Sequence, residues 1–351
     1  MPAVKPSVSN MNALFLVPSE LAGCIRRRGF RRLTVRAVVE LAAPQTWGAS
    51  VMPVVLAAAF AIAGGGAGAI AGGASPAPTG FGAGGFSFPL FFSLLGTAVC
   101  LQCAVNTLND YSDFIAGVDR RENCIDETDA SIVYHDYEPV LAFVVGVGFI
   151  GLALLCGLYA LVTVGPELLL FGAVGAAVVF LYAYGVIPLS YTPVGEFLSG
   201  VVMGGVIPLA CFYAFTRSLD PRIVAYSVPV ILTIALIMLT NNGCDIEKDR
   251  AAQRHTLPTR IGRRRALALH ALLFAAALAW ASAVSVFRFG LAAAWLIPLL
   301  CAWLIPQEVR LVREGLLPEN RIRSMALATG ANIRLNALYA AMVLLPSLPG
   351  L

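Results

Sequence analysis

Hydrophobic positions along the chain gather in long runs that short polar segments separate. A run of about 20 apolar residues is long enough for an α-helix to cross the hydrocarbon core of a bilayer. Each such run therefore predicts one membrane-spanning helix. Nine runs meet this description, and they cover Trp47 to Ile70, Phe88 to Asn109, Pro139 to Val162, Leu168 to Ile187, Gly195 to Phe215, Ile223 to Asn242, Ala266 to Val286, Phe289 to Ile305 and Ala331 to Leu348.

The composition agrees with this pattern. Of the 351 residues 58% are hydrophobic and only 13% are charged, and the mean hydropathy is +0.80. These values are typical of a polytopic membrane protein rather than of a water-soluble domain. We expect an all-α polytopic membrane protein with about nine transmembrane helices around a central cavity. A cytoplasmic and interfacial segment would occupy residues 1–45, and a single transmembrane domain residues 46–348.

Basic residues are distributed unequally between the two sides of the predicted helices. With a cytoplasmic N-terminus, 20 of the 24 Lys and Arg fall inside, Arg217, Arg222 and Arg288 fall outside, and Arg334 lies at a boundary. Cytoplasmic loops of membrane proteins carry such an excess of positive charge. The pattern predicts a multi-pass protein of the cell membrane with a cytoplasmic N-terminus. The net charge of +4 then reflects topology, so the bilayer and not nucleic acid is the expected partner.

Acidic and amide side chains gather where two of the apolar runs end. The stretch NTLNDYSDFIAGVD covers Asn106 to Asp119, and the stretch NNGCDIEKD covers Asn241 to Asp249. A carboxylate in or beside hydrocarbon is costly unless it is paired, so such residues indicate a functional site. The two stretches also suggest two pseudo-repeated four-helix units plus one further helix. Packed face to face, these units would bring the cytoplasmic loops 106–138 and 241–265 together.

The spacing within each stretch favours a metal site. On a continuous helix Asn106, Asp110 and Asp113 share a face, and Asn241, Asp245 and Asp249 do the same. Converging carboxylates would repel one another unless a hard divalent cation lay between them. Ligands that are all oxygen atoms favour Mg2+ over Zn2+. An anionic substrate is the natural companion of such a cation.

Basic residues follow both stretches and suit an anionic substrate. Arg120 and Arg121 follow the first, and the second is followed or overlapped by Lys248, Arg250, Arg254 and Arg260. The positive charge of cytoplasmic loops explains the same residues without a binding role.

These stretches resemble the signatures of a known family. NDYSDFIAGVD and NNGCDIEKDRAAQRHTLPTRIG are similar to the two Asp-rich motifs of the UbiA-type intramembrane prenyltransferases, closest to their 1,4-dihydroxy-2-naphthoate polyprenyltransferase branch. AAPQTWGASVMPVVLAA and VGEFLSGVVMGGVIPL are similar to two further segments of that branch. The chain departs from the family pattern at Ala43 and Cys244, where the family has arginine, and at Gln253 and Arg254, where it has Gly-Lys.

The resemblance implies Mg2+-dependent transfer of a polyprenyl group from an isoprenoid diphosphate to an aromatic acceptor. That acceptor would be 1,4-dihydroxy-2-naphthoate or a related quinone precursor in menaquinone biosynthesis. The implied catalytic residues are Asp110, Asp113, Asp245 and Asp249, which together with Asn109 would also hold the metal. The implied substrate-binding residues are Asn106, Arg120, Glu196, Asn241, Asn242, Lys248 and Arg254. Asp119 would bind a second metal or order its loop.

Other functions are open at this point. Acidic residues in a repeated helical architecture also occur in ion-coupled secondary transporters, although there they usually lie near the membrane midplane. Another membrane transferase, such as a magnesium-dependent phosphatidyltransferase or an enzyme with a different lipid or aromatic acceptor, is the enzymatic alternative. His135 and His255 could shuttle a proton or simply be solvated, and His270 is expected to make a packing hydrogen bond.

Overall fold

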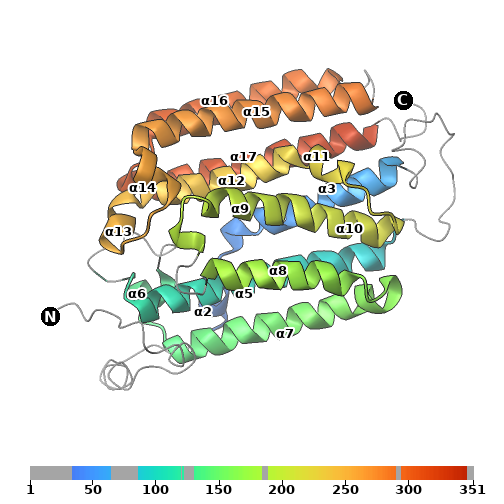
Figure 1. Ribbon diagram of the computed structural model, residues 1–351. Helices are drawn as coiled ribbons and strands as arrows, with labels where there is room; N and C mark the ends of the chain where they lie inside the picture. Colours follow the sequence, from blue (N-terminus) through green and yellow to red (C-terminus); the bar gives the residue numbers. More distant parts are fainter. Residues whose placement is uncertain are drawn as a thin grey trace.

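The computed structural model describes residues 34–64, 86–119, 121, 130–183, 189–289 and 294–345, and nearly all of these lie in helices. The long helices run side by side through the molecule (Figure 1). The predicted fold class, an all-α polytopic membrane protein, is confirmed. The elements are α2 (Val35–Ala42), η2 (Pro44–Thr46), α3 (Gly48–Gly64), α5 (Phe88–Ala116), α6 (Ser131–His135), α7 (Pro139–Val164), α8 (Leu168–Ala183), η3 (Leu189–Tyr191), α9 (Gly195–Val201), η4 (Val202–Val206), α10 (Ile207–Thr216), α11 (Arg222–Tyr226), α12 (Val228–Cys244), α13 (Ile246–Ala251), α14 (Leu257–Ile261), α15 (Arg263–Phe289), α16 (Leu296–Glu314), η6 (Pro318–Asn320) and α17 (Arg321–Leu344).

Several of these helices are suited to a membrane by length and composition. Within the described residues four qualify: Phe88–Ile115, Pro139–Val164, Gly195–Thr216 and Arg263–Phe287. The pair Val35–Thr46 and Gly48–Ala63, bent by 56°, would add a fifth if it forms one broken span. Helices α8 and α12 are apolar but shorter. The number of nine spans therefore stays a prediction.

Several predicted boundaries differ from the structure, among them the starts of the last two helices. The eighth span was expected to begin at Phe289, but α15 continues to that residue and α16 begins at Leu296. The last helix begins at Arg321 rather than at Ala331. Hydropathy marks the part of a helix that faces hydrocarbon, whereas backbone hydrogen bonds continue through polar turns at either end. The added turns of α17 bring Arg321 to the end of α12.

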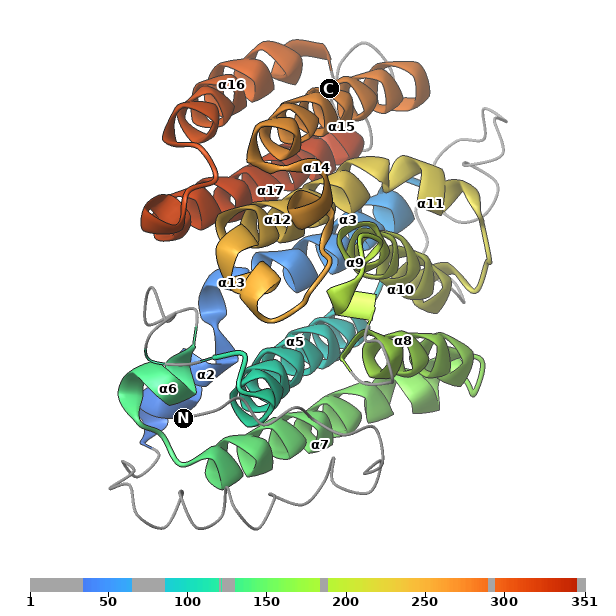
Figure 2. The ribbon, with the colours of Figure 1, turned by 60° about the vertical axis from the view of Figure 1, so that its left-hand side comes forward.

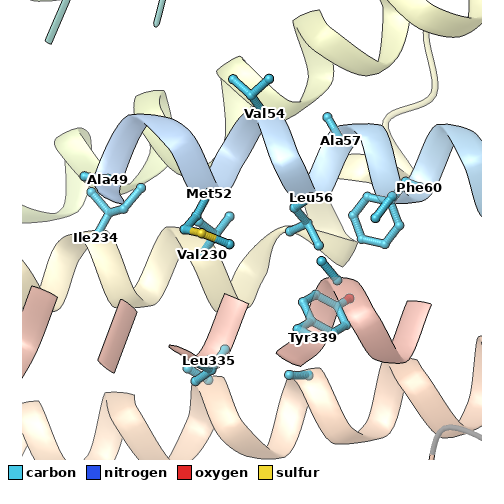
Figure 3. Packing of buried hydrophobic residues seen from close by; sticks show 14 of the residues in the cluster. Ala49, Met52, Val54, Leu56, Ala57, Phe60, Val230, Ile234, Leu335 and Tyr339 are labelled. Atoms are coloured by element: carbon cyan, nitrogen blue, oxygen red, sulfur yellow. The ribbon is translucent and has the colours of Figure 1, made fainter. Parts of the chain in front are cut away.

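The core lies where α3 packs against α12 and α17. Figure 3 shows Met52, Leu56 and Phe60 of α3 beside side chains of these two helices. Polar groups also join α12 to α17, since Asn332 and Asn336 each donate a hydrogen bond to Thr233 Oγ1, at 2.8 and 3.0 Å. Interhelical hydrogen bonds of this kind supplement van der Waals packing where lipid removes the hydrophobic driving force.

Close backbone contact fixes α9 and η4 against α12. A Cβ atom added at Gly204 would lie 2.5 Å from Ile231 Cα, and one added at Gly200 would lie 2.5 Å from the Ile231 carbonyl oxygen. Only glycine permits this approach. The contact brings the start of α9, with Glu196, alongside the end of α12.

The two acidic stretches lie at the same end of the bundle. Figures 1 and 2 both place α13 and α14 at the end where α2 and α6 also lie. The described part of the predicted interfacial segment forms α2, which Thr34 caps by accepting a hydrogen bond from Ala37 N. The remainder of that segment, residues 1–33, lies outside the described residues.

Candidate functional site

Helix α5 continues through the first acidic stretch and then turns sharply. It ends at Ala116, and Gly117 follows with φ +69°, a left-handed conformation that glycine adopts without steric cost. The amides of Val118 and Asp119 both donate to the carbonyl of Asp113, at 2.9 and 3.2 Å. The turn thus carries Asp119 back beside the helix end.

The side chains of this stretch divide between two tasks. Asn109 Nδ2 donates to Asp113 Oδ2 at 3.1 Å on an exposed surface, so these two oxygen-bearing groups share a face as predicted. Asn106 instead donates to the Ala42 carbonyl at 3.0 Å and to Thr46 Oγ1 at 2.9 Å. Its amide therefore holds the turn between α2 and α3.

Asp110 connects α5 to the loop that follows it. Its Oδ2 atom accepts a hydrogen bond from the backbone amide of Ile132, in the first turn of α6, at 3.3 Å. A carboxylate at this position satisfies an amide that the short helix leaves without an internal partner. Asp110 thereby joins α5 to the start of α6.

The second stretch bends at Asp245. Helix α12 ends at Cys244, and Asp245 has φ −100° and ψ 17° before α13 begins. Asn241 and Asp245 share a side, because both contact Arg321. Asp249 contacts Arg254 and Thr256. The structure thus confirms a common side for Asn241 and Asp245, and the place of Asp249 on that side stays a prediction.

The end of α13 explains where Arg254 lies. Gln253 N donates to the Arg250 carbonyl at 3.1 Å and Arg254 N donates to the Asp249 carbonyl at 2.8 Å. This pair of bonds is the Schellman motif, which requires a left-handed residue, and Gln253 supplies it with φ +58°. The turn folds Arg254 back against Asp249.

Asp249 lies in a buried polar cluster. Its side chain is 2% exposed, its Oδ1 lies 3.5 Å from Arg254 Nε, and its Oδ2 accepts from Thr256 Oγ1 at 2.9 Å. The Arg254 guanidinium lies 4.9 Å from the centre of the Tyr191 ring. Burial disfavours the charge of Arg254, but the attraction of Asp113 and Asp249 outweighs it and raises the pKa of the guanidinium. Arg254 thus interacts with both acidic stretches.

A direct ion pair also joins the two stretches. Lys248 Nζ of the second lies 2.7 Å from Asp119 Oδ1 of the first, and the two side chains are only 9% and 2% exposed. The prediction that the motifs meet is confirmed by this contact between residues far apart in the sequence.

Arg321 is a residue that sequence reasoning missed. Its Nε lies 3.3 Å from Asp245 Oδ1, and its Nη2 donates to Asn241 Oδ1 at 2.7 Å. The sequence shows it only as one more cytoplasmic arginine. The last helix is apolar except at its start. This polar start is a pattern that could have indicated Arg321 as a site residue.

Glu196 contacts the second stretch from α9. Its Oε1 accepts from Asn242 Nδ2 at 2.8 Å and from Leu257 N at 3.1 Å. Its Oε2 is buried and accepts no hydrogen bond from a described residue. Buried carboxylate oxygens are normally satisfied, so this atom is a candidate contact for a ligand.

The donor set suits a hard cation, although its members are spread out. Asn109 and Asp113 present amide and carboxylate oxygens on an exposed face, and Mg2+ typically uses one or two carboxylates with water or phosphate. In the described part of the chain, no three acidic, histidine or cysteine side chains gather as a metal-binding group. Asp245 and Asp249 have basic partners in this arrangement.

The remaining predicted residues lie elsewhere. Arg120 is outside the described residues, while Arg121 pairs with Asp136. His135 lies 3.7 Å from Glu40 Oε2, on the side of α2. His255 is exposed and its backbone amide donates to the Tyr191 carbonyl at 2.8 Å. The predicted packing bond of His270 is confirmed, since its Nδ1 lies 2.9 Å from Glu308 Oε1.

Comparison with known proteins gives consistent matches. The family model described as the UbiA prenyltransferase family matches residues 59–330. A 1,4-dihydroxy-2-naphthoate octaprenyltransferase of Bacillus subtilis (strain 168) is 33% identical over 239 residues, which cover 67% of this chain and 75% of that protein. A protein of the same name from Mycobacterium tuberculosis is 30% identical over 184 residues, covering 52% of this chain and 62% of that protein.

Solved structures show the same fold. A UbiA homolog from Archaeoglobus fulgidus, bound to DMAPP and Mg2+, aligns with a TM-score of 0.57 and 15% identity over 87% of this chain and 99% of that chain. The apo structure of a UbiA homolog from Aeropyrum pernix K1 aligns with a TM-score of 0.54 and 16% identity over 85% of this chain and 99% of that chain.

Proposed function

Because this chain belongs to the UbiA prenyltransferase family, we propose that it transfers a polyprenyl group to 1,4-dihydroxy-2-naphthoate or a related quinone precursor in menaquinone biosynthesis. The donor is a polyprenyl diphosphate. The names of the relatives from B. subtilis and M. tuberculosis support this acceptor. Family membership leaves the transporter alternative without support.

The observation that carries the proposal is the buried cluster formed by both acidic stretches. Lys248 of the second stretch pairs with Asp119 of the first, and Arg254 interacts with Asp249 of the second stretch and Asp113 of the first. A diphosphate that enters between these stretches meets both cations. Arg254 offers a planar group with several donors, which suits phosphate oxygens. These two residues bind the donor's diphosphate, and Arg120 joins them from the first loop.

The metal residues of the proposal are Asn109, Asp110, Asp113, Asp245 and Asp249. Their oxygen atoms suit Mg2+, which when bound would neutralise the charge that grows on the departing diphosphate. Asp110 also joins α5 to α6 through its bond to Ile132. Arg321 and Arg254 lie beside the carboxylates of Asp245 and Asp249 and offset part of their negative charge.

The aromatic acceptor binds on the side of Glu196 and Asn242. The buried Oε2 of Glu196 is a suitable acceptor for a hydroxyl proton of the aromatic ring. Asn242 holds the other carboxylate oxygen and so fixes the orientation of Glu196. Asn241 lies on the adjacent position of α12. The reaction takes place on the cytoplasmic side of the cell membrane, as the distribution of basic residues predicts.

The test uses the purified full chain in nanodiscs with Mg2+, polyprenyl diphosphates of several lengths and 1,4-dihydroxy-2-naphthoate. Diphosphate release and prenylated product are both measured. We expect the two to appear together, to stop with EDTA and to return with added Mg2+. If no prenylated product forms with any donor and several aromatic acceptors, the proposed function is wrong.

A further inference from the structure

The start of α17 is joined to the second acidic stretch by a buried arginine. The Arg321 side chain is 8% exposed and that of Asp245 is 7% exposed. One nitrogen of Arg321 faces Asp245 and another donates to Asn241. A guanidinium is a planar fork that binds two acceptors at once, so it fixes the distance between them.

The chain that leads to Arg321 is also packed on this stretch. A Cβ atom added at Gly243 would lie 2.5 Å from Leu316 Cδ1, which shows how closely Leu316 covers the end of α12. Arg263 Nε donates to the carbonyls of Gly243 and Leu316. Ser324 Oγ donates to the Gly315 carbonyl at 3.0 Å and closes the turn. The position of Arg321 is therefore fixed by several contacts.

The residue that precedes Asp245 in the chain is Cys244, which is buried and uncharged. A buried carboxylate is costly without a cation, and removing one partner of such a pair is strongly destabilising. Here a cation comes from a helix that contains neither acidic stretch.

We propose that Arg321 is a positioning residue for the transfer reaction, which holds the Asp245 carboxylate and the Asn241 amide in their active orientation. The inference rests on the proposed function, and it makes the start of α17 a part of the active site. Arg321 acts through Asp245. Its loss therefore changes kcat and the Mg2+ concentration that the reaction requires, while the reaction of the donor stays the same.

The experiment compares Arg321→Gln, Arg321→Lys, Asp245→Asn and the double variant Arg321→Gln/Asp245→Asn in the full chain. Arg323→Gln is the matched control, because Arg323 lies two residues further along α17, is 74% exposed and has only a distant contact of 3.8 Å to Glu314. For each protein we measure kcat, the donor KM, the Mg2+ concentration at half-maximal rate and the midpoint of thermal unfolding without substrate.

We expect Arg321→Gln to lower kcat by about 10- to 100-fold, the range found when a partner of a metal ligand is removed. The half-maximal Mg2+ concentration rises, and Arg321→Lys restores part of kcat. The double variant is no slower than Asp245→Asn alone, because both changes break the same ion pair between Arg321 and Asp245. Arg323→Gln matches the wild type.

Several results would overturn the inference. One is an Arg321→Gln protein with wild-type kcat and Mg2+ requirement, and another is a double variant whose losses multiply. If Arg321→Gln does not fold, Arg321→Lys decides: a lowered kcat at the wild-type unfolding midpoint supports the inference, and wild-type kinetics overturn it. If the wild-type chain itself forms no product, the proposed function fails and the inference fails with it.

Discussion

Asp249 and Asp113 contribute charge to one cluster from two different helices. Asp249 is almost fully buried beside Arg254 and Thr256, whereas Asp113 lies on the exposed face with Asn109. The pKa of Arg254 is raised by both. Each carboxylate therefore has a distinct place, and replacing either by its amide removes charge with little change in shape.

We expect Asp113→Asn and Asp249→Asn each to lower kcat by about 100- to 1,000-fold, as when one group that stabilises transition-state charge is lost. Product formation in nanodiscs checks this. Asp136→Asn is the control, because Asp136 is 39% exposed and pairs with Arg121. Wild-type turnover in either test variant would exclude that residue from the site.

Variants of Arg254 test whether this residue binds the donor rather than the acceptor. Loss of a hydrogen bond to a charged group costs about 1.5–3 kcal/mol, so Arg254→Ala should raise the donor KM by about 10- to 100-fold. The acceptor KM should change little, and Arg254→Lys should restore much of the donor affinity. Steady-state kinetics with each substrate varied in turn provide the measurement. Arg265→Ala, an exposed residue of the same end, serves as control. If the donor KM of Arg254→Ala is unchanged, Arg254 does not bind the donor. Its positive charge then contributes only to the membrane orientation of the chain.

Gln253 occupies a backbone position that favours glycine. Its φ of +58° is left-handed, which costs a residue with a side chain about 1–2 kcal/mol. Gln253→Gly relieves this strain but adds freedom to the unfolded chain, so we expect a net gain of about 1 kcal/mol. Thermal unfolding in detergent checks it. Ala252→Gly is the control, and it should lower the free energy of unfolding. Ala252 has φ −84°, so glycine relieves no backbone strain there. If Gln253→Gly and Ala252→Gly lower the unfolding midpoint equally, the backbone at Gln253 is not strained.

At the scale of the elements, contact between α9, η4 and α12 decides where Glu196 and Asn242 meet. Gly204 faces backbone atoms of Ile231 and Val230, which cannot move without shifting α12. The π-helical turn from Val202 to Val206 places Gly204 and Gly205 at this contact. Such turns often occur at functional sites.

Gly204→Ala tests this contact. The new methyl would lie 2.5 Å from Ile231 Cα, and overpacking of this kind costs about 1–3 kcal/mol. We expect a lower unfolding midpoint together with a higher acceptor KM, since Glu196 would move away from Asn242. Gly172→Ala on α8 is the matched control, because no atom lies within 4 Å of its added Cβ. A midpoint equal to that of Gly172→Ala would show that α9 and α12 can separate at no cost.

The elements also show how far the sequence could predict the site. Spacing along one helix is local information, so it correctly placed Asn109 beside Asp113. The apolar runs predicted most helices for the same reason. The partners of the carboxylates could not be predicted, because Lys248 meets Asp119, and Arg321 meets Asp245, through tertiary packing. The bend at Asp245 could not be predicted from the sequence either. Asn241 and Asp249 each lie four residues from Asp245, a spacing that is equally typical of an unbroken helix.

At the scale of the whole molecule, the cluster lies at one end, together with basic residues of α13 and of the start of α15. Lys248, Arg254 and Arg263 belong to this end, and the connection between α10 and α11 belongs to the opposite one (Figure 1). The excess of Lys and Arg predicts that the cluster end faces the cytoplasm.

Labelling of single cysteines can test this orientation. Leu219→Cys lies between α10 and α11, where Leu219 is 62% exposed, and Ala251→Cys lies at the exposed end of α13. In intact cells a membrane-impermeant maleimide should label the first above the level of the unaltered chain. It should label the second only after the membrane is opened, because Ala251 would face the cytoplasm with the basic residues around it. The unaltered chain measures the reaction of native cysteines, and activity of both variants shows that they fold. Labelling of Ala251→Cys but not Leu219→Cys in intact cells would reverse the predicted topology and place the cluster of Asp249 and Arg254 outside the cell.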